Sequence, residues 1–196
     1  PSVRGGGPPP VRTRRHVTGR ADADPRYSNE LRTANLIVER ACTLLDLAYQ
    51  SGAEFILENP ADRGNPAEPH LFLTAEHGPI WLMPDVSTLA QRSQAKTVTF
   101  PMCAFSAPWQ KYTTLLYTPG LESWMKPLDR LNCTHASHDR IAGGEVDSNG
   151  AWRSTEAASY PPAFNYYVAR AFASLLLPHA VTASKPTSPV DRSVLR

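Results

Sequence analysis

The most regular hydrophobic pattern in the chain lies between residues 27 and 50. Apolar residues recur there three or four positions apart, at Leu31, Ala34, Ile37, Val38, Ala41, Leu44, Leu45 and Ala48. This spacing places them on one face of an α-helix. Asp24 and Pro25 precede the run as a capping side chain and a first-turn proline, and Gly52 follows it. The pattern predicts one amphipathic helix over about 27–50.

A short strand is predicted directly after this helix. The apolar run Phe55-Ile56-Leu57 is followed by Glu58 and by the turn signal Asn59-Pro60. An unbroken apolar run of this kind is typical of a central parallel strand that is buried on both faces. Glu58 and Asn59 would then lie at the carboxyl end of that strand, where open α/β sheets bind ligands.

The remaining pattern alternates between helix and strand. It predicts a helix opened by Pro84 over about 85–94, strands at 97–100 and 113–117, and a helix near 121–131. Pro161-Pro162 then opens a final amphipathic helix. Helices that alternate with β-branched strands indicate an α/β sandwich.

The two ends of the chain differ from this middle part. Residues 1–26 hold six Arg and two Asp, and they include three glycines at 5–7 followed by three prolines at 8–10, which do not favour regular structure. Residues 178–196 are rich in Pro, Ser, Thr and Ala. The expected organisation is a basic N-terminal arm over 1–24, an α/β domain over 25–177 and a disordered C-terminal tail over 178–196.

The composition also indicates the cellular compartment in which the protein is located. No stretch approaches the roughly 18 consecutive apolar residues of a membrane span, and the N-terminus lacks the apolar core of a signal peptide. Cys42, Cys103 and Cys133 are an odd number of widely spaced cysteines, which argues against a disulfide framework. These features predict an intracellular protein of the nucleus or cytoplasm that is neither secreted nor inserted in a membrane.

Two segments resemble the second half of a cytosine-5 DNA methyltransferase. In that family a strand ends in Glu-Asn-Val, and a later segment reads roughly Tyr-Gly-x-Pro-Gln-x-Arg-x-Arg before the next strand. Here Glu58-Asn59 match the first motif, with Pro60 in place of its valine. In the second motif Pro108 matches the proline, and Lys111 falls on the position of the first arginine. Trp109 replaces the glutamine.

The resemblance extends over residues 25–177. Pro161-Pro162 and the helix after them resemble the closing motif of the family, which packs beside the cofactor site. The chain is also similar to methyltransferase-like proteins through the blocks ILENPADRG, AEHGP, QKYTTLLY and CTH. This resemblance implies a partial Rossmann-like methyltransferase sandwich, and it implies that the chain is the base-binding portion of an S-adenosylmethionine-dependent DNA cytosine-5 methyltransferase-like protein.

The resemblance also implies roles for individual residues. In the family reaction a thiolate adds to carbon 6 of cytosine, while a carboxylic acid at N3 stabilises the developing charge so that carbon 5 can take a methyl group. Glu58 would be that acid, and Asn59 would support the pocket. Lys111 would hold a flipped base or its phosphate, and Trp109 would stack on the base. The alternatives are a solvated strand end for Glu58 and core or rim packing for Trp109.

The basic arm would supply further contacts to nucleic acid. Arg12, Arg14 and Arg15 would bind phosphates independently of sequence, with DNA as the expected partner rather than RNA. The alternative is an unstructured linker in which the positive charge is incidental.

Two parts of the family pattern are missing. The chain has no glycine-rich strand and loop for S-adenosylmethionine and no Pro-Cys nucleophile motif, and the family order places both before residue 1. A missing N-terminal half of the fold or a partner chain would have to supply them. This fragment alone is therefore expected to bind no cofactor and to be catalytically incomplete.

Two other functions compete with this hypothesis. The first is a non-catalytic nucleic-acid-binding or scaffold module derived from the methyltransferase fold, which the substitutions within the motifs favour. The second is an amino-methyltransferase, which ranks last because the chain lacks an Asp/Asn-Pro-Pro-aromatic motif.

One loop carries metal-binding residue types. Cys133, His135 and His138 offer the sulfur and nitrogen ligands that zinc prefers, but Cys-x-His-x-x-His is not a standard finger spacing. A fourth ligand would have to come from Cys103 or water. The sequence therefore predicts no resident metal, with zinc as the less favoured interpretation. Cys42 and Cys103 are interpreted as buried structural thiols.

Overall fold

The computed structural model of the chain describes residues 11–65, 78–109, 111–138 and 158–176. Its main elements are α1 (Ser28–Gln50), β1 (Ile56–Pro60), α2 (Pro84–Ser93), β2 (Lys96–Pro101), β3 (Tyr112–Tyr117), α3 (Glu122–Met125) and α4 (Pro162–Leu176). Short 3-10 turns join several of them, including η3 (Met102–Phe105) and η5 (Lys126–Arg130). None of the helices in the described part of the chain combines the length and the hydropathy that a membrane span requires.

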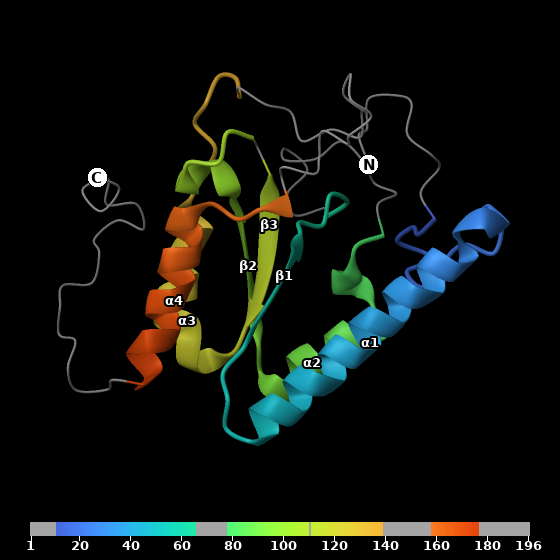
Figure 1. The fold of residues 1–196 in the computed structure, drawn as a ribbon, viewed down its shortest axis with the longest axis horizontal. Helices are drawn as coiled ribbons and strands as arrows, with labels where there is room; N and C mark the ends of the chain where they lie inside the picture. The colour runs from blue at the N-terminus through green and yellow to red at the C-terminus, as the bar shows by residue number, and fades with distance from the viewer. Residues whose placement is uncertain (1–10, 66–77, 110, 139–157, 177–196) are drawn as a thin grey trace. The chain divides into compact units, whose positions relative to one another are not determined.

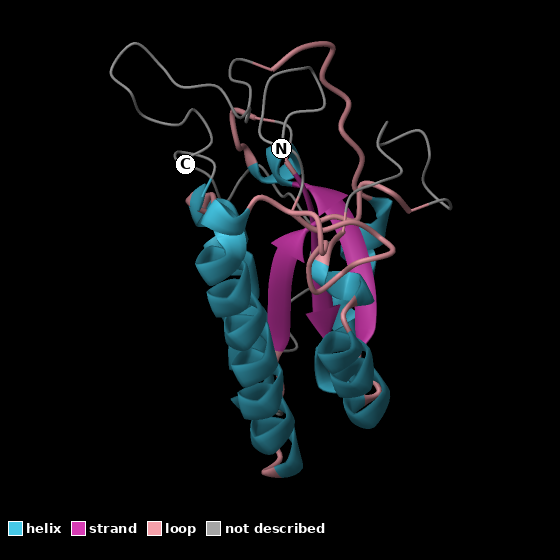
Figure 2. Cartoon of the chain, turned by 90° about the vertical axis from the view of Figure 1, so that its right-hand side faces the viewer, coloured by secondary structure: helices cyan, strands magenta, loops and turns pink. Residues whose placement is uncertain are grey.

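The three strands form a small antiparallel sheet with the order β1-β3-β2. The Thr118 amide donates to the Phe55 carbonyl (3.3 Å), so the end of β3 meets the start of β1. The Met102 amide donates to the Lys111 carbonyl (2.8 Å), so the end of β2 meets the start of β3. The central strand therefore runs opposite to both of its neighbours (Figure 2). The mixed α/β class predicted from the sequence is confirmed.

The prediction of a central parallel strand at residues 55–57 is wrong within the described residues. β1 is an edge of the three-stranded sheet, and its only neighbour there, β3, is antiparallel. Phe55 is 4% exposed, whereas Ile56 and Leu57 are half-buried. An antiparallel edge strand can leave part of its surface to solvent, so a short apolar run does not require burial on both faces.

The structure divides into two compact units. Unit 1 comprises residues 1–97 and 114–119, and unit 2 comprises residues 98–113 and 120–196. In unit 1, α1 and α2 lie side by side (Figure 1). The core of unit 1 consists of Cys42, Phe55, Met83, Val86, Leu89 and Leu116.

The helix α1 forms as its pattern predicts. The Asp24 carboxylate accepts a hydrogen bond from the Arg26 amide (2.9 Å) and caps the 3-10 turn that leads into the helix. Gly52 follows the last turn with φ +85°, a conformation that favours glycine. The face of α1 opposite its core contacts carries exposed apolar side chains, namely Leu36 (45% exposed), Ile37 (62%), Leu44 (67%) and Leu47 (55%).

Residues 11–24 do not extend away from unit 1 as an arm. They form turns against the start of α1, where the Asn35 side-chain amide donates to the Thr18 carbonyl (2.6 Å) and Gly19 approaches Leu31. These local contacts hold a segment whose own sequence favours no helix or strand. The rest of the predicted arm, residues 1–10, and the predicted tail over 178–196 lie outside the described residues.

Unit 2 is built around four aromatic rings. Phe100, Phe105, Phe164 and Tyr167 pack with ring centroids 5.3–5.8 Å apart. Phe164 and Tyr167 come from α4, the final helix, which begins at Pro162 as predicted. The single helix predicted near 121–131 is instead the short α3 followed by η5. Pro127 explains this difference, because it has no amide hydrogen to continue an α-helix.

Candidate metal centre and aromatic pocket

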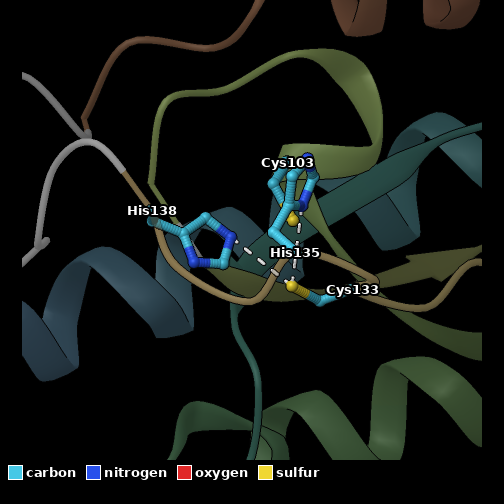
Figure 3. A group of neighbouring side chains, drawn as sticks. All are labelled: Cys103, Cys133, His135 and His138. Atoms are coloured by element: carbon cyan, nitrogen blue, oxygen red, sulfur yellow. Dashed lines mark hydrogen bonds between the residues drawn. The ribbon is translucent and has the colours of Figure 1, made fainter.

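Four side chains with sulfur or nitrogen donors converge in unit 2, and we call them the Cys/His cluster (Figure 3). Cys103 lies on η3, whereas Cys133, His135 and His138 lie on the segment after η5. The four donor atoms lie within 4.8 Å of one another. Cys133 Sγ is 3.8 Å from His135 Nδ1 and 3.4 Å from His138 Nε2. The fold thus brings the loop of Cys133, His135 and His138 next to Cys103, which the sequence analysis gave as one possible fourth ligand.

The backbone on both sides positions this cluster. η3 begins after Pro101 and ends at Ser106, whose φ of +67° turns the chain sharply. On the other side, the fully buried Leu128 anchors η5, and the Leu131 amide donates to the Leu128 carbonyl (3.0 Å). The chain leaves this turn without forming a helix or strand over residues 131–138.

The two ends of the Cys/His cluster differ in their exposure to water. Cys103 is 5% exposed, Cys133 and His138 are half-buried, and His135 is exposed. Burial, together with a hydrogen bond that the Cys103 thiol donates to Cys133, raises the pKa of Cys103 to about 12. A thiol with such a pKa is a poor nucleophile at neutral pH, in keeping with the structural role predicted for Cys103. A cation could still take the place of its proton.

Unit 2 also contains a cavity of about 350 Å³, which we call the aromatic pocket. Two segments that are distant in sequence line it, namely residues 105–109 and residues 159–163. Most of the lining is apolar, with Trp109 (9% exposed) from the first segment and Tyr160 (38% exposed) from the second. Its size falls at the lower end of the range of about 300–1,000 Å³ that is usual for small-molecule sites.

Lys111 is held beside this pocket. Its ammonium nitrogen lies 5.5 Å from the centroid of the Tyr160 ring, within reach of a cation–π interaction. The structure therefore brings the predicted residues Trp109 and Lys111 to one feature, and Tyr160 connects them. Sequence reasoning missed Tyr160, although its place next to Pro161-Pro162 was a usable signal.

Glu58 and Asn59 are half-buried on β1 and belong to unit 1. The strand end after them is well held, because the Trp81 indole donates to the Pro60 carbonyl (2.9 Å) and Arg14 pairs with Asp62. The acid and amide lie in the carboxyl-terminal part of a strand, as predicted, but β1 continues through Pro60, where the sequence predicts a turn. Their predicted roles toward a base remain predictions.

The predicted phosphate-binding arginines have different surroundings in unit 1. The guanidinium of Arg12 donates to the Asn35 side chain, and burial lowers the pKa of Arg12. Arg14 binds both carboxylate oxygens of Asp62 at 2.6 and 2.7 Å. Both side chains thus fasten residues 11–24 to the rest of unit 1. Arg15 is exposed.

Comparison with protein-family models, with curated proteins and with solved structures gives no match to this chain.

Proposed function

We propose that unit 2 binds an unstacked base of a nucleic acid, with DNA as the partner, in the aromatic pocket. We propose further that the chain is the base-binding portion of an S-adenosylmethionine-dependent DNA cytosine-5 methyltransferase-like protein with a partial Rossmann-like fold. The observation that carries this proposal is the lining of the pocket. Its two walls, residues 105–109 and 159–163, overlap the segments whose motifs resemble that family.

The chemistry of the pocket suits a base and its phosphate. Every base has a face that can stack on an aromatic side chain, and each such contact contributes about 1–3 kcal/mol. Trp109 and Tyr160 supply aromatic surface, while Lys111 supplies a positive charge next to Tyr160. An apolar slot with one cation at its rim would accept a flipped base while its phosphate stays near the charge.

The resemblance implies a role for Glu58 of unit 1 that is proposed independently of the aromatic pocket. In this role Glu58 hydrogen-bonds to N3 of a cytosine ring in the intact protein and donates a proton as charge develops there, while Asn59 supports Glu58. The support for this role is the resemblance at the end of β1 and the half-buried position of both side chains.

The described residues do not fit S-adenosylmethionine. α1 is preceded by the turns of residues 11–24, and the described part of the chain contains no strand and glycine-rich loop before it. The cofactor would therefore bind to the other half of the fold or to a partner chain. The exposed apolar face of α1 supports the presence of further polypeptide against this helix.

A binding assay tests the pocket. Fluorescence anisotropy of a labelled, cytosine-containing single strand would be titrated with the chain and with Lys111→Met, Tyr160→Leu and Lys126→Met. Loss of the stacking ring or of the rim cation should weaken binding by about tenfold, which corresponds to the lower end of the stacking range. Lys126 is an exposed lysine of the same unit and serves as the charge-matched control. Equal affinities for Lys111→Met and Lys126→Met would contradict the proposal.

A second assay separates the enzyme from the non-catalytic module. Methyl transfer to cytosine would be measured with the intact protein, including whatever supplies the cofactor site. Transfer that requires Glu58 supports the enzyme, whereas DNA binding without transfer supports the scaffold alternative.

A further inference from the structure

We propose that Cys103, Cys133, His135 and His138 bind one zinc ion in a closed structural site. The proposal rests on the geometry of unit 2 alone and is independent of the nucleic-acid function. It reverses the interpretation favoured by the sequence, in which the loop carried no metal.

The distances within the Cys/His cluster suit a tetrahedral ion. Zinc lies about 2.3 Å from sulfur and about 2.0–2.1 Å from nitrogen, so two such ligands at the tetrahedral angle are about 3.6 Å apart. The sulfur of Cys133 lies 3.8 and 3.4 Å from the two histidine nitrogens. All four donors fall within 4.8 Å of one another, so an ion among them needs only small side-chain adjustments.

The donor set also fits zinc chemically. Two cysteines and two histidines are one of the usual ligand sets of structural zinc sites. On binding, the thiols of Cys103 and Cys133 each release a proton to solvent, and the two imidazoles bind as neutral ligands. The two thiolates balance the charge of Zn²⁺, so the site is neutral overall, which suits the buried position of Cys103.

Four protein ligands leave no coordination position for water or substrate, so the site is structural rather than catalytic. Residues 131–138 form neither helix nor strand, and most of them are exposed. A metal ion would join this segment to η3, which lies some thirty positions earlier in the sequence. The ion would thus hold the loop against the rest of unit 2, as buried apolar side chains do for other segments of the fold.

The test measures zinc in the full chain, purified without a histidine tag and dialysed against metal-free buffer. We expect one zinc per chain in the wild type and its loss in Cys133→Ser and in His138→Ala. His16→Ala, which removes an exposed histidine of unit 1, should retain the zinc and serves as the matched control. A zinc content well below one per chain in the wild type would overturn the proposal.

A cobalt titration keeps the proposal testable if a variant folds poorly. Apoprotein loaded with Co²⁺ should show the visible absorption of a tetrahedral site together with sulfur-to-cobalt charge transfer. Cys133→Ser should lose the tetrahedral absorption and the charge transfer, as it loses the zinc, whereas Cys42→Ala should keep both. An octahedral cobalt spectrum in the wild type would contradict the site.

A disulfide between Cys103 and Cys133 is the competing chemistry. The chain contains three cysteines, so the zinc protein should show three reactive thiols after denaturation with a chelator under non-reducing conditions. A count of one would show a disulfide and overturn the proposal. Failure of DNA binding in the assay above would leave these zinc measurements unaffected.

Discussion

The packing of Phe105 leads to a quantitative prediction for the stability of unit 2. Phe105 is 2% exposed. Its ring lies 5.7 Å from Phe100, 5.3 Å from Phe164 and 5.7 Å from Tyr167, measured between centroids. Phe105→Ala removes the ring that contacts all three of these partners and leaves a cavity between η3 and α4.

The expected loss follows from two contributions. Burial of a phenylalanine side chain contributes about 1.5–3 kcal/mol, and each well-oriented aromatic pair adds about 0.5–1.5 kcal/mol, although the pairs are not additive. Buried Phe→Ala substitutions cost about 3–5 kcal/mol in total. We expect Phe105→Ala to lower the free energy of unfolding by an amount in this range, which is a large part of the 5–15 kcal/mol or so that is typical of a native domain.

Urea denaturation followed by tryptophan fluorescence measures this loss. With a slope of about 1–3 kcal/mol per molar urea, a loss of about 4 kcal/mol moves the midpoint by about 2 M. Leu176→Ala on α4 is the control, because Leu176 is 81% exposed and its loss should change the stability by no more than about 0.5 kcal/mol. A loss below about 1 kcal/mol for Phe105→Ala would refute a packed four-ring core.

Three further predictions concern unit 1 and the proposed reaction. A double-mutant cycle with Arg14→Gln and Asp62→Asn should give a coupling of about 1 kcal/mol in urea denaturation, because one guanidinium nitrogen donates to both carboxylate oxygens but the pair is partly exposed. Zero coupling would contradict a stabilising pair. Burial, reinforced by the negative charge of Asp85, raises the pKa of Cys42 from 9.0 to about 11. The Cys42 thiol therefore loses its proton at a lower pH in the unfolded chain than in the folded chain. The melting temperature should fall as the pH rises from about 9 to about 11, and this fall should be less steep in Cys42→Ala. In the intact protein, Glu58→Gln should reduce methyl transfer by about 10²-fold or more without shifting the unfolding midpoint, and unchanged transfer would exclude the proposed role.

Elements with local signals could be predicted from the sequence. α1 follows from its apolar spacing and from the Asp24 cap, both of which lie within the element or next to it. The position of β1 in the sheet does not follow from local signals, since it depends on pairing between Phe55 and Thr118, which are far apart in the chain. An apolar run of this length does not distinguish a parallel central strand from an antiparallel edge strand. Pro127 was a local signal that the pattern of residues 121–131 concealed.

In the candidate sites too, residues that are neighbours in sequence could be recognised, whereas contacts between distant residues could not. Cys133, His135 and His138 lie within six residues and were visible as a group, but their value as ligands depends on Cys103, which only the fold brings to them. The sequence showed the charge of Arg14 but not its partner Asp62, and phosphate binding by Arg14 remains a prediction. A charged side chain has many possible partners, and its pattern alone does not select one of them.

The segment over residues 102–109 connects the features of unit 2. It carries the buried ligand Cys103, the core ring of Phe105 and, at Trp109, a wall of the aromatic pocket. Ser106 turns the chain between them with a positive φ, so the segment has little freedom to adjust at one end alone. A metal ion that fixes Cys103 would therefore also restrain the wall at Trp109, although it touches no part of the pocket. If the pocket binds a base as proposed, a structural metal would contribute to base recognition without any chemistry of its own, because an apolar pocket binds a flat base well only when its walls are held at a fixed separation.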